Sequence, residues 1–290
     1  MTLNEQDILR VIKGAALLAS GGGGSVTDGL DLLANYKKRY PGKRIQVELI
    51  DTSDMADAAC AVVIAGMGAP TKGAHKDFTL CAGASYDEIG RIAVREGKRI
   101  GYTMPIEMGG FNTIAPMLVS LARNYPVIDA DGAGRAVPGL DTVLVHVNGY
   151  ETSPLALADE HNNRVEIIMA DPRDAAGAQK IAAPIANGYF DGNAGIAGWM
   201  LNRSQIEDAL PLGTITLAGK IGLLIEKAKT GGAGLEDIFG MINGLDGIEA
   251  CALTTATKII GYTPNVNPDF DNGYYYIGSS PAAPQFKIAY

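Results

Sequence analysis

Residues 101–138, GYTMPIEMGGFNTIAPMLVSLARNYPVIDADGAGRAVP, are the stretch from which the fold of this chain is inferred. Two loops rich in glycine and acidic residues, Glu107–Asn112 and Asp129–Arg135, flank an apolar segment. That segment, residues 114–124, has apolar residues at helical spacing and Pro116 in its first turn, which predicts a helix. If this helix returns the chain to the same edge of a sheet, the two loops lie close together.

The sequence before this stretch alternates between apolar runs typical of strands and amphipathic helical patterns. Such alternation predicts an α/β fold, with a parallel or mixed sheet covered by helices and a smaller α+β region after it. We expect ligands outside the carboxyl ends of the parallel strands, where the glycine-rich loops fall. The expected strands are 44–50, 59–66 and 98–103, and the expected helices are 8–18, 26–40 and 86–96.

After Pro138 the pattern changes to short strands separated by turn signals. This change predicts an antiparallel meander and places a boundary near residue 140. We therefore expect an α/β domain over 1–140, which carries the glycine-rich loops, and an α+β region over 141–290. In the second region the expected strands are 141–147, 154–158 and 164–169, and the expected helices are 172–183, 203–210, 214–229 and 235–243.

Composition narrows the class of protein. The net charge of −8 and the lack of a basic face argue against nucleic acid as a partner. Three cysteines without a CxxC pair fit a reducing compartment, and neither a signal-like start nor an apolar run of about 18 residues is present. We therefore expect a cytoplasmic protein without a membrane span, whose partner is a small molecule. An apolar, glycine-containing segment such as 213–225 suits a homo-oligomer interface or, equally, an internal core.

The candidate catalytic residues are the carboxylates Glu107, Asp129 and Asp131. They could act as general acid and base, with one pKa raised by its neighbours. They could instead bind a divalent ion with His75 as a nitrogen ligand, or the two aspartates could hold Arg135 and fix their loop. No cofactor is expected, and a divalent metal with unknown ligands stays an open alternative.

The candidate binding residues surround these carboxylates in the loops. Four glycines at 21–24 expose backbone N–H groups before a helix N-terminus, an arrangement that suits a carboxylate, an imide anion or a phosphate. A flexible connector is the alternative, and neither a P-loop nor a dinucleotide fingerprint is present. The expected substrate-binding set is Gly21, Gly22, Gly23, Gly24, Ser25, His75, Gly109, Gly110, Asn112, Gly132 and Arg135.

Five segments over roughly residues 5–230 resemble, in order, the S-methyl thiohydantoin desulfurase-like family, which is associated with hydantoinases. The resemblance implies an α/β domain followed by a β-containing domain, and chemistry on a thiohydantoin- or hydantoin-like ring. Two departures are a Gly139 where the family has Glu, and a tyrosine-rich tail in place of its glycine-rich β region. The segments are 18–24, 107–112, 129–138, 154–159 and 211–218.

Together these patterns predict a hydrolase or lyase that acts on a small cyclic amide or thioamide by carboxylate-assisted chemistry. A non-catalytic ligand-binding protein, or an accessory subunit of a hydantoinase-like system, is the alternative. A metal-dependent hydrolase is a third possibility.

Overall fold

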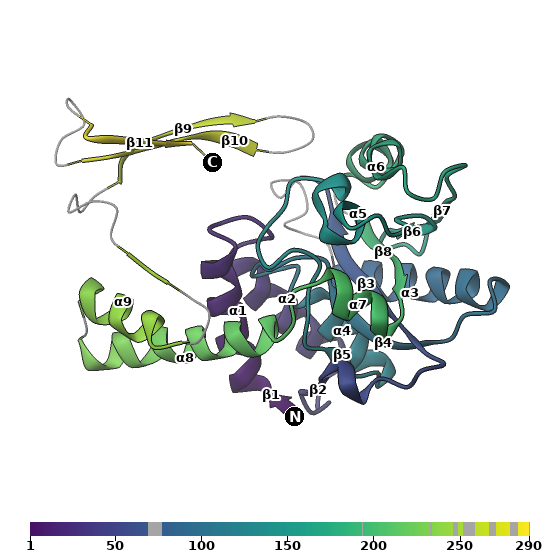
Figure 1. Cartoon of the computed structure of the whole chain (residues 1–290), viewed down its shortest axis with the longest axis horizontal. Coiled ribbons are helices and arrows are strands. Elements are labelled where there is room, and N and C mark those ends of the chain that lie inside the picture. The colour runs from purple at the N-terminus through teal and green to yellow at the C-terminus, as the bar shows by residue number, and fades with distance from the viewer. Residues whose placement is uncertain are drawn as a thin grey trace. The chain divides into compact units, whose positions relative to one another are not determined.

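The computed structural model describes two compact units, Met1–Glu226 and Lys227–Tyr290 (Figure 1). The sequence pattern placed the boundary at 140 instead. The difference arises because three strands beyond residue 140 join the parallel strands in one sheet. The described residues are 1–68, 77–192, 194–232, 234–245, 249–251, 259–266, 271–278 and 284–289.

The first unit contains a mixed sheet with the strand order β1-β2-β5-β4-β3-β8-β6-β7. Its centre, β2-β5-β4-β3, is parallel, as the alternating pattern predicted, whereas β1, β8, β6 and β7 each pair antiparallel with their neighbours. The strands are β1 (Thr2–Asn4), β2 (Gln46–Ile50), β3 (Cys60–Met67), β4 (Ile100–Pro105), β5 (Val127–Ile128), β6 (Leu155–Ala158), β7 (Arg164–Ile167) and β8 (Ala194–Leu201).

Helices cover both faces of this sheet. Asn4 and Ser25 begin the first two helices with capping boxes. The Asn4 side chain accepts from Asp7 N while the Asp7 side chain accepts from Asn4 N, and Ser25 and Asp28 make the same reciprocal pair. The α-helices are α1 (Glu5–Leu18), α2 (Val26–Arg39), α3 (Phe78–Arg95), α4 (Ala115–Arg123), α5 (Leu144–Val147), α6 (Ala175–Pro184), α7 (Arg203–Ala209) and α8 (Thr214–Gly231). Short turns of 3₁₀-helix, η1 (Thr52–Asp54) and η2 (Leu140–Thr142), and one of π-helix, η3 (Ile185–Tyr189), complete the unit.

Two hydrophobic cores lie on opposite faces of the sheet. Val62 and Ile64 of β3 pack with α1 to α4, while Ala61, Val63 and Ala65 of the same strand pack with α5 to α7. A strand buried on both faces requires the continuous apolar run that the sequence shows. The central strands are therefore rigid, and the loops at their ends have defined positions.

Two segments differ from the sequence-based expectation. Residues 141–147 were predicted as a strand but form η2 and α5, because Thr142 closes a local turn on Gly139 and Leu144 N donates to Gly132 O at 2.9 Å. The central strand β8 was missed because its glycines are untypical of strands. At Gly195 a Cβ would lie 2.3 Å from Cys81 O, so glycine is needed for α3 to approach the sheet.

The second unit contains α9 (Leu235–Asn243) and an antiparallel sheet of the order β11-β10-β9, formed by β9 (Ile259–Val266), β10 (Asp271–Ile277) and β11 (Phe286–Ala289). The predicted α+β region began at 141, so this unit corresponds only to its last part, in which the short strands of the tyrosine-rich tail pair into a sheet. No helix among the described residues is long and apolar enough to cross a membrane.

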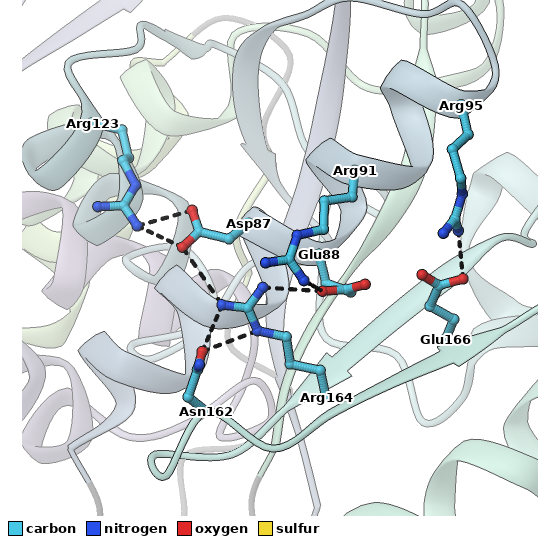
Figure 2. Close-up of polar contacts among 8 residues, drawn as sticks. All are labelled: Asp87, Glu88, Arg91, Arg95, Arg123, Asn162, Arg164 and Glu166. Atoms are coloured by element: carbon cyan, nitrogen blue, oxygen red, sulfur yellow. Dashed lines mark hydrogen bonds and ion pairs between the residues drawn. The ribbon is translucent and has the colours of Figure 1, made fainter.

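A network of ion pairs joins the β6–β7 hairpin to α3 (Figure 2). Arg164 of β7 lies 3.0 Å from Glu88 of α3, which also pairs with Arg91 at 2.8 Å. Asp87 accepts from Arg123 of α4 and lies 3.9 Å from Arg164, whose guanidinium also donates to Asn162. The Glu88 side chain is only 9% exposed, so its charge depends on these partners.

Arg164→Ala is expected to lower the free energy of unfolding by about 1–3 kcal/mol, because it removes one of the two cations that face a nearly buried carboxylate. Chemical denaturation measures the change. Arg203→Ala is the matched control, because its i,i+4 pair with Glu207 is exposed and should contribute about 0.5 kcal/mol or less. Equal losses in the two variants would show that the network adds nothing beyond a surface pair.

Candidate active site

The structure brings the two acidic loops together at the carboxyl edge of the parallel sheet. Glu107 follows the end of β4, and Asp129 and Asp131 follow the end of β5, which pairs parallel with β4. Gly132 N donates to Pro105 O at 3.3 Å and so ties the second loop to the end of β4. All three carboxylates are buried. The neighbouring strand ends thus place acidic groups where α/β sheets usually bind ligands.

Glu107 is a buried carboxylate with both oxygens hydrogen-bonded. Its Oε1 accepts from Asn112 Nδ2 and its Oε2 from Val137 N, each at 2.6 Å. Burial raises the pKa of Glu107 to about 7, these two hydrogen bonds lower it, and the charge of Asp131 raises it further. Glu107 therefore changes its protonation state near neutral pH, which suits a general acid or base.

Asp131 is fully buried and only one of its oxygens accepts backbone amides. Its Oδ1 accepts from Ala133 N at 2.8 Å and from Gly134 N at 2.6 Å, while its buried Oδ2 has only the Thr214 hydroxyl near it. Burial raises the pKa of Asp131 to about 6, while the two amides and the nearby Thr214 hydroxyl lower it. A buried acceptor with fewer hydrogen bonds than it can accept is costly, so Oδ2 is the atom of this pair most available to a ligand.

Asn112 fixes Glu107 rather than facing open space. Its Nδ2 donates to Glu107, and its Oδ1 accepts from Gly66 N of β3 at 2.9 Å. Both ends of the amide are thus used within the protein. The prediction that Asn112 binds substrate is untested, but its contacts make it a positioning residue that links β3 to the acidic pair.

Asp129 has a different role from its neighbour two residues on. Its Oδ1 accepts from Ile215 N at 2.9 Å and Thr216 N at 3.1 Å, and its Oδ2 accepts from the Thr216 hydroxyl. These are the free amides of the first turn of α8, which a carboxylate stabilises through hydrogen bonds and the helix dipole. Both oxygens of Asp129 are therefore hydrogen-bonded to the start of α8, and the catalytic role predicted for Asp129, Glu107 and Asp131 stays a prediction.

The glycine quartet lies against the Glu107 loop. Gly24 O accepts from Gly110 N at 2.9 Å, and Gly23 O accepts from Phe111 N and Asn112 N. Gly109 N donates to the Thr113 hydroxyl. The amides of Gly109 and Gly110, which belong to the expected substrate-binding set, are thus used inside the loop, whereas those of Gly23 and Gly24 donate to no described protein atom.

Gly23→Ala is expected to destabilise the protein by several kcal/mol. Its φ is +61°, and an added Cβ would lie 2.3 Å from Met108 O, a backbone atom beside Glu107. Gly83→Ala in α3 is the control, because no atom lies within 4 Å of its added Cβ and the change should stabilise the helix by up to about 1 kcal/mol. Thermal denaturation of both variants measures these two effects, and an unaltered melting temperature for Gly23→Ala would contradict the close packing of Gly23 on Met108 O.

The remaining residues of the predicted set are placed differently. Ser25 caps α2 through Asp28 N, and Gly22 approaches Ala136 so closely that a Cβ on Gly22 would lie 2.4 Å from the Ala136 Cβ. Gly132 packs on Ile106 O. Arg135 is exposed and forms no ion pair with a described residue, so it does not hold the aspartates. His75 lies outside the described residues.

Thr214 is the residue of this site that sequence reasoning missed. It is buried at the start of α8, and its hydroxyl lies near Asp131 and lowers the pKa of that carboxyl. The signal was present in Pro211–Ala218, where a glycine and a threonine precede a helical pattern. Its proximity to Asp131, 83 positions earlier, is a tertiary contact that no local pattern reveals.

Metal binding has no assembled ligand set in the described part of the chain. No group of three or more His, Cys, Asp or Glu side chains there is placed to hold an ion.

The comparisons with known proteins agree with the fold. Residues 6–169 match the family described as S-Me-THD-like, N-terminal domain. A crystal structure of a protein from Chromobacterium violaceum is 25% identical to this chain, with a TM-score of 0.82, and the match covers 100% of this chain and 77% of the other. No curated protein matches the sequence.

Proposed function

The chain belongs to the S-Me-THD-like family, and on that premise we propose that it is an enzyme that hydrolyses a thiohydantoin- or hydantoin-like ring at the Glu107–Asp131 pair. The observation that carries the proposal is the Oδ2 of Asp131, which accepts no backbone amide and has only the Thr214 hydroxyl near it, beside a second buried carboxylate with a pKa of about 7. Two carboxyl groups whose protonation differs near neutral pH provide an acid and a base in one site.

In the proposed reaction, Asp131 Oδ2 accepts a proton from a water molecule while the oxygen of that water attacks the electrophilic ring carbon. For an S-methyl thiohydantoin this is the thioether carbon. The new C–O bond replaces the C–S bond, Glu107 supplies the proton that the leaving thiolate takes up, and the remaining hydroxyl proton moves to the adjacent ring nitrogen. A ring carbonyl then stands where the thioether was, and the reaction needs no oxidant or reductant. For a plain hydantoin, the same groups assist attack on a ring carbonyl and opening of the C–N bond.

Access to the pair depends on the 131–138 loop. Asp131 is 0% exposed and Glu107 is 6% exposed, so neither meets a substrate in this conformation. The segment that covers Glu107 contributes one hydrogen bond, from Val137 N, and its neighbour Arg135 is exposed. Displacing this segment opens the pair beside the glycine quartet, whose Gly23 and Gly24 amides then meet the developing negative charge.

The test is a turnover assay on S-methyl thiohydantoins, thiohydantoins and hydantoins of simple amino acids. Release of thiol or ring-opened acid, followed by NMR, supports the proposal. A parallel assay with a chelator distinguishes metal-dependent hydrolysis from the two-carboxylate mechanism. Loss of turnover on chelation and its recovery with a divalent ion would favour the metal-dependent mechanism instead.

The second candidate is a ligand-binding or accessory protein of a hydantoinase-like system. The complete burial of Asp131 favours it, because a closed site is compatible with binding without turnover. Thermal stabilisation by one of these rings without product would support this candidate and reject the enzymatic proposal.

A further inference from the structure

A cavity of about 680 Å³ lies at the opposite edge of the sheet from the acid pair. It is lined by residues at the starts of β3 and β4, including Cys60 and Arg99, and by Trp199–Leu201 at the end of β8. The segment Gly149–Pro154 and Arg173 complete its wall. The volume is in the range of small-molecule sites, and the position is independent of the carboxyl-edge loops.

Charges of both signs line this cavity without partners. Arg99 and Arg173 are cationic and Asp57 and Glu151 are anionic, and none forms an ion pair or a side-chain hydrogen bond with a described residue. Lys98, which also lines it, pairs with Glu96 at 2.8 Å. A ligand with one positive and one negative group matches the four unpaired charges better than a simple anion does.

Buried residues form the apolar side of the same cavity. Cys60, Trp199 and Leu201 are at most 7% exposed. Trp199 Nε1 is buried without a hydrogen-bond partner among the described residues, and its φ of +49° is unusual for a bulky residue. The register between β3 and β8 shifts at this point. The strained backbone and the unpaired donor at this cavity wall each need an explanation, and a bound ligand is one that would account for the unpaired donor.

We infer that this amino-edge cavity binds a small zwitterion with an apolar side chain, that is, a free amino acid or a short peptide. The guanidinium groups of Arg99 and Arg173 hold its carboxylate, and Asp57 and Glu151 hold its ammonium group. Its apolar side chain lies towards Trp199 and Leu201. The inference does not depend on the reaction proposed for Glu107 and Asp131.

Trp199 provides a specific signal because it is the only tryptophan of the chain. L-leucine and the dipeptide leucyl-leucine are titrated while tryptophan fluorescence is followed, and calorimetry measures the same binding directly. A saturable response to at least one probe is expected. N-acetyl-L-leucine and L-leucinamide, which each lack one charge, should bind at least about tenfold more weakly than L-leucine. The absence of binding by both methods, or equal binding of the blocked derivatives, overturns the inference.

Variants assign the binding to the cavity. Arg99→Ala with Arg173→Ala, and separately Asp57→Asn with Glu151→Gln, should each weaken binding at least about tenfold. All four side chains are exposed, so the variants should fold. Arg44→Ala, an exposed arginine outside this cavity, should bind like the wild type. Loss of binding in Arg44→Ala would contradict the assignment.

Discussion

Asp131→Asn is expected to reduce ring turnover by about a hundredfold or more while it raises the stability of the protein at pH 8. Both changes are expected together if Asp131 takes part in the reaction and its burial as a carboxylate destabilises the fold. Asparagine keeps an oxygen for the amides of Ala133 and Gly134, and its NH₂ group takes the place of Oδ2 beside the Thr214 hydroxyl, which can turn to accept from it. It cannot accept a proton from water, so the proposed base is lost.

The sign of the stability change follows from the pKa of Asp131. Burial raises this pKa from 3.8 to about 6, so the folded state binds the proton more tightly than the unfolded state. The stability that this protonated form contributes is fully present below pH 4 and is lost as the pH rises through 6. A shift of roughly two pKa units corresponds to about 3 kcal/mol, which sets the expected gain for Asp131→Asn at pH 8. At pH 4 the gain should vanish.

Glu107→Gln is the informative companion variant. It should also lose turnover, but it should stabilise the protein less than Asp131→Asn does. Both oxygens of Glu107 accept N–H bonds, so a carboxamide turns its NH₂ group towards another donor. Urea denaturation of the wild type and both variants at pH 4, 6 and 8 measures these differences. Full turnover in both variants would remove the acid pair from the mechanism, and an unchanged pH dependence would show that neither carboxylate titrates as proposed.

Much of the fold could be predicted because local physics and the tertiary structure agree there. The capping residues Asn4 and Ser25 begin helices as their sequences predict, and the apolar run of β3 is a strand buried on both faces. Prediction failed at β8, where Gly195 serves the approach of α3. It also failed at 141–147, where a turn at Gly139–Thr142 outweighs an alternating pattern.

The candidate site could be located from the sequence but not resolved into roles. Glycines beside acidic residues at strand ends predicted that these loops would meet at the carboxyl edge of the sheet, and the structure brings them together there. Asp129 and Asp131 have the same chemistry and lie two positions apart, so only their partners distinguish them. Those partners lie far along the chain: Ile215 is 86 positions from Asp129. Thr214 was missed for a similar reason, because it lies 83 positions from Asp131 in the sequence.

Asp129→Ala is expected to lower the free energy of unfolding by about 3 kcal/mol, through the loss of its hydrogen bonds to the first turn of α8. Alanine leaves Ile215 N, which is buried, without its acceptor. The start of α8 belongs to the main core, since Ile215 and Ala218 pack there, so the loss reaches the whole first unit. A decrease of about 10 °C in melting temperature is the corresponding thermal effect for a unit of this size.

Asp129→Asn separates this structural role from a catalytic one. Its carbonyl oxygen can still accept from Ile215 N and Thr216 N, and the Thr216 hydroxyl can turn to accept from the new NH₂ group. Only the charge at the helix N-terminus is lost, which costs up to about 1 kcal/mol. Asp129→Asn should therefore retain turnover, in contrast to Asp131→Asn. If Asp129→Asn instead loses turnover as Asp131→Asn does, and Asp129→Ala melts like the wild type, then Asp129 belongs to the reacting groups and the assignment of the pair must be reversed.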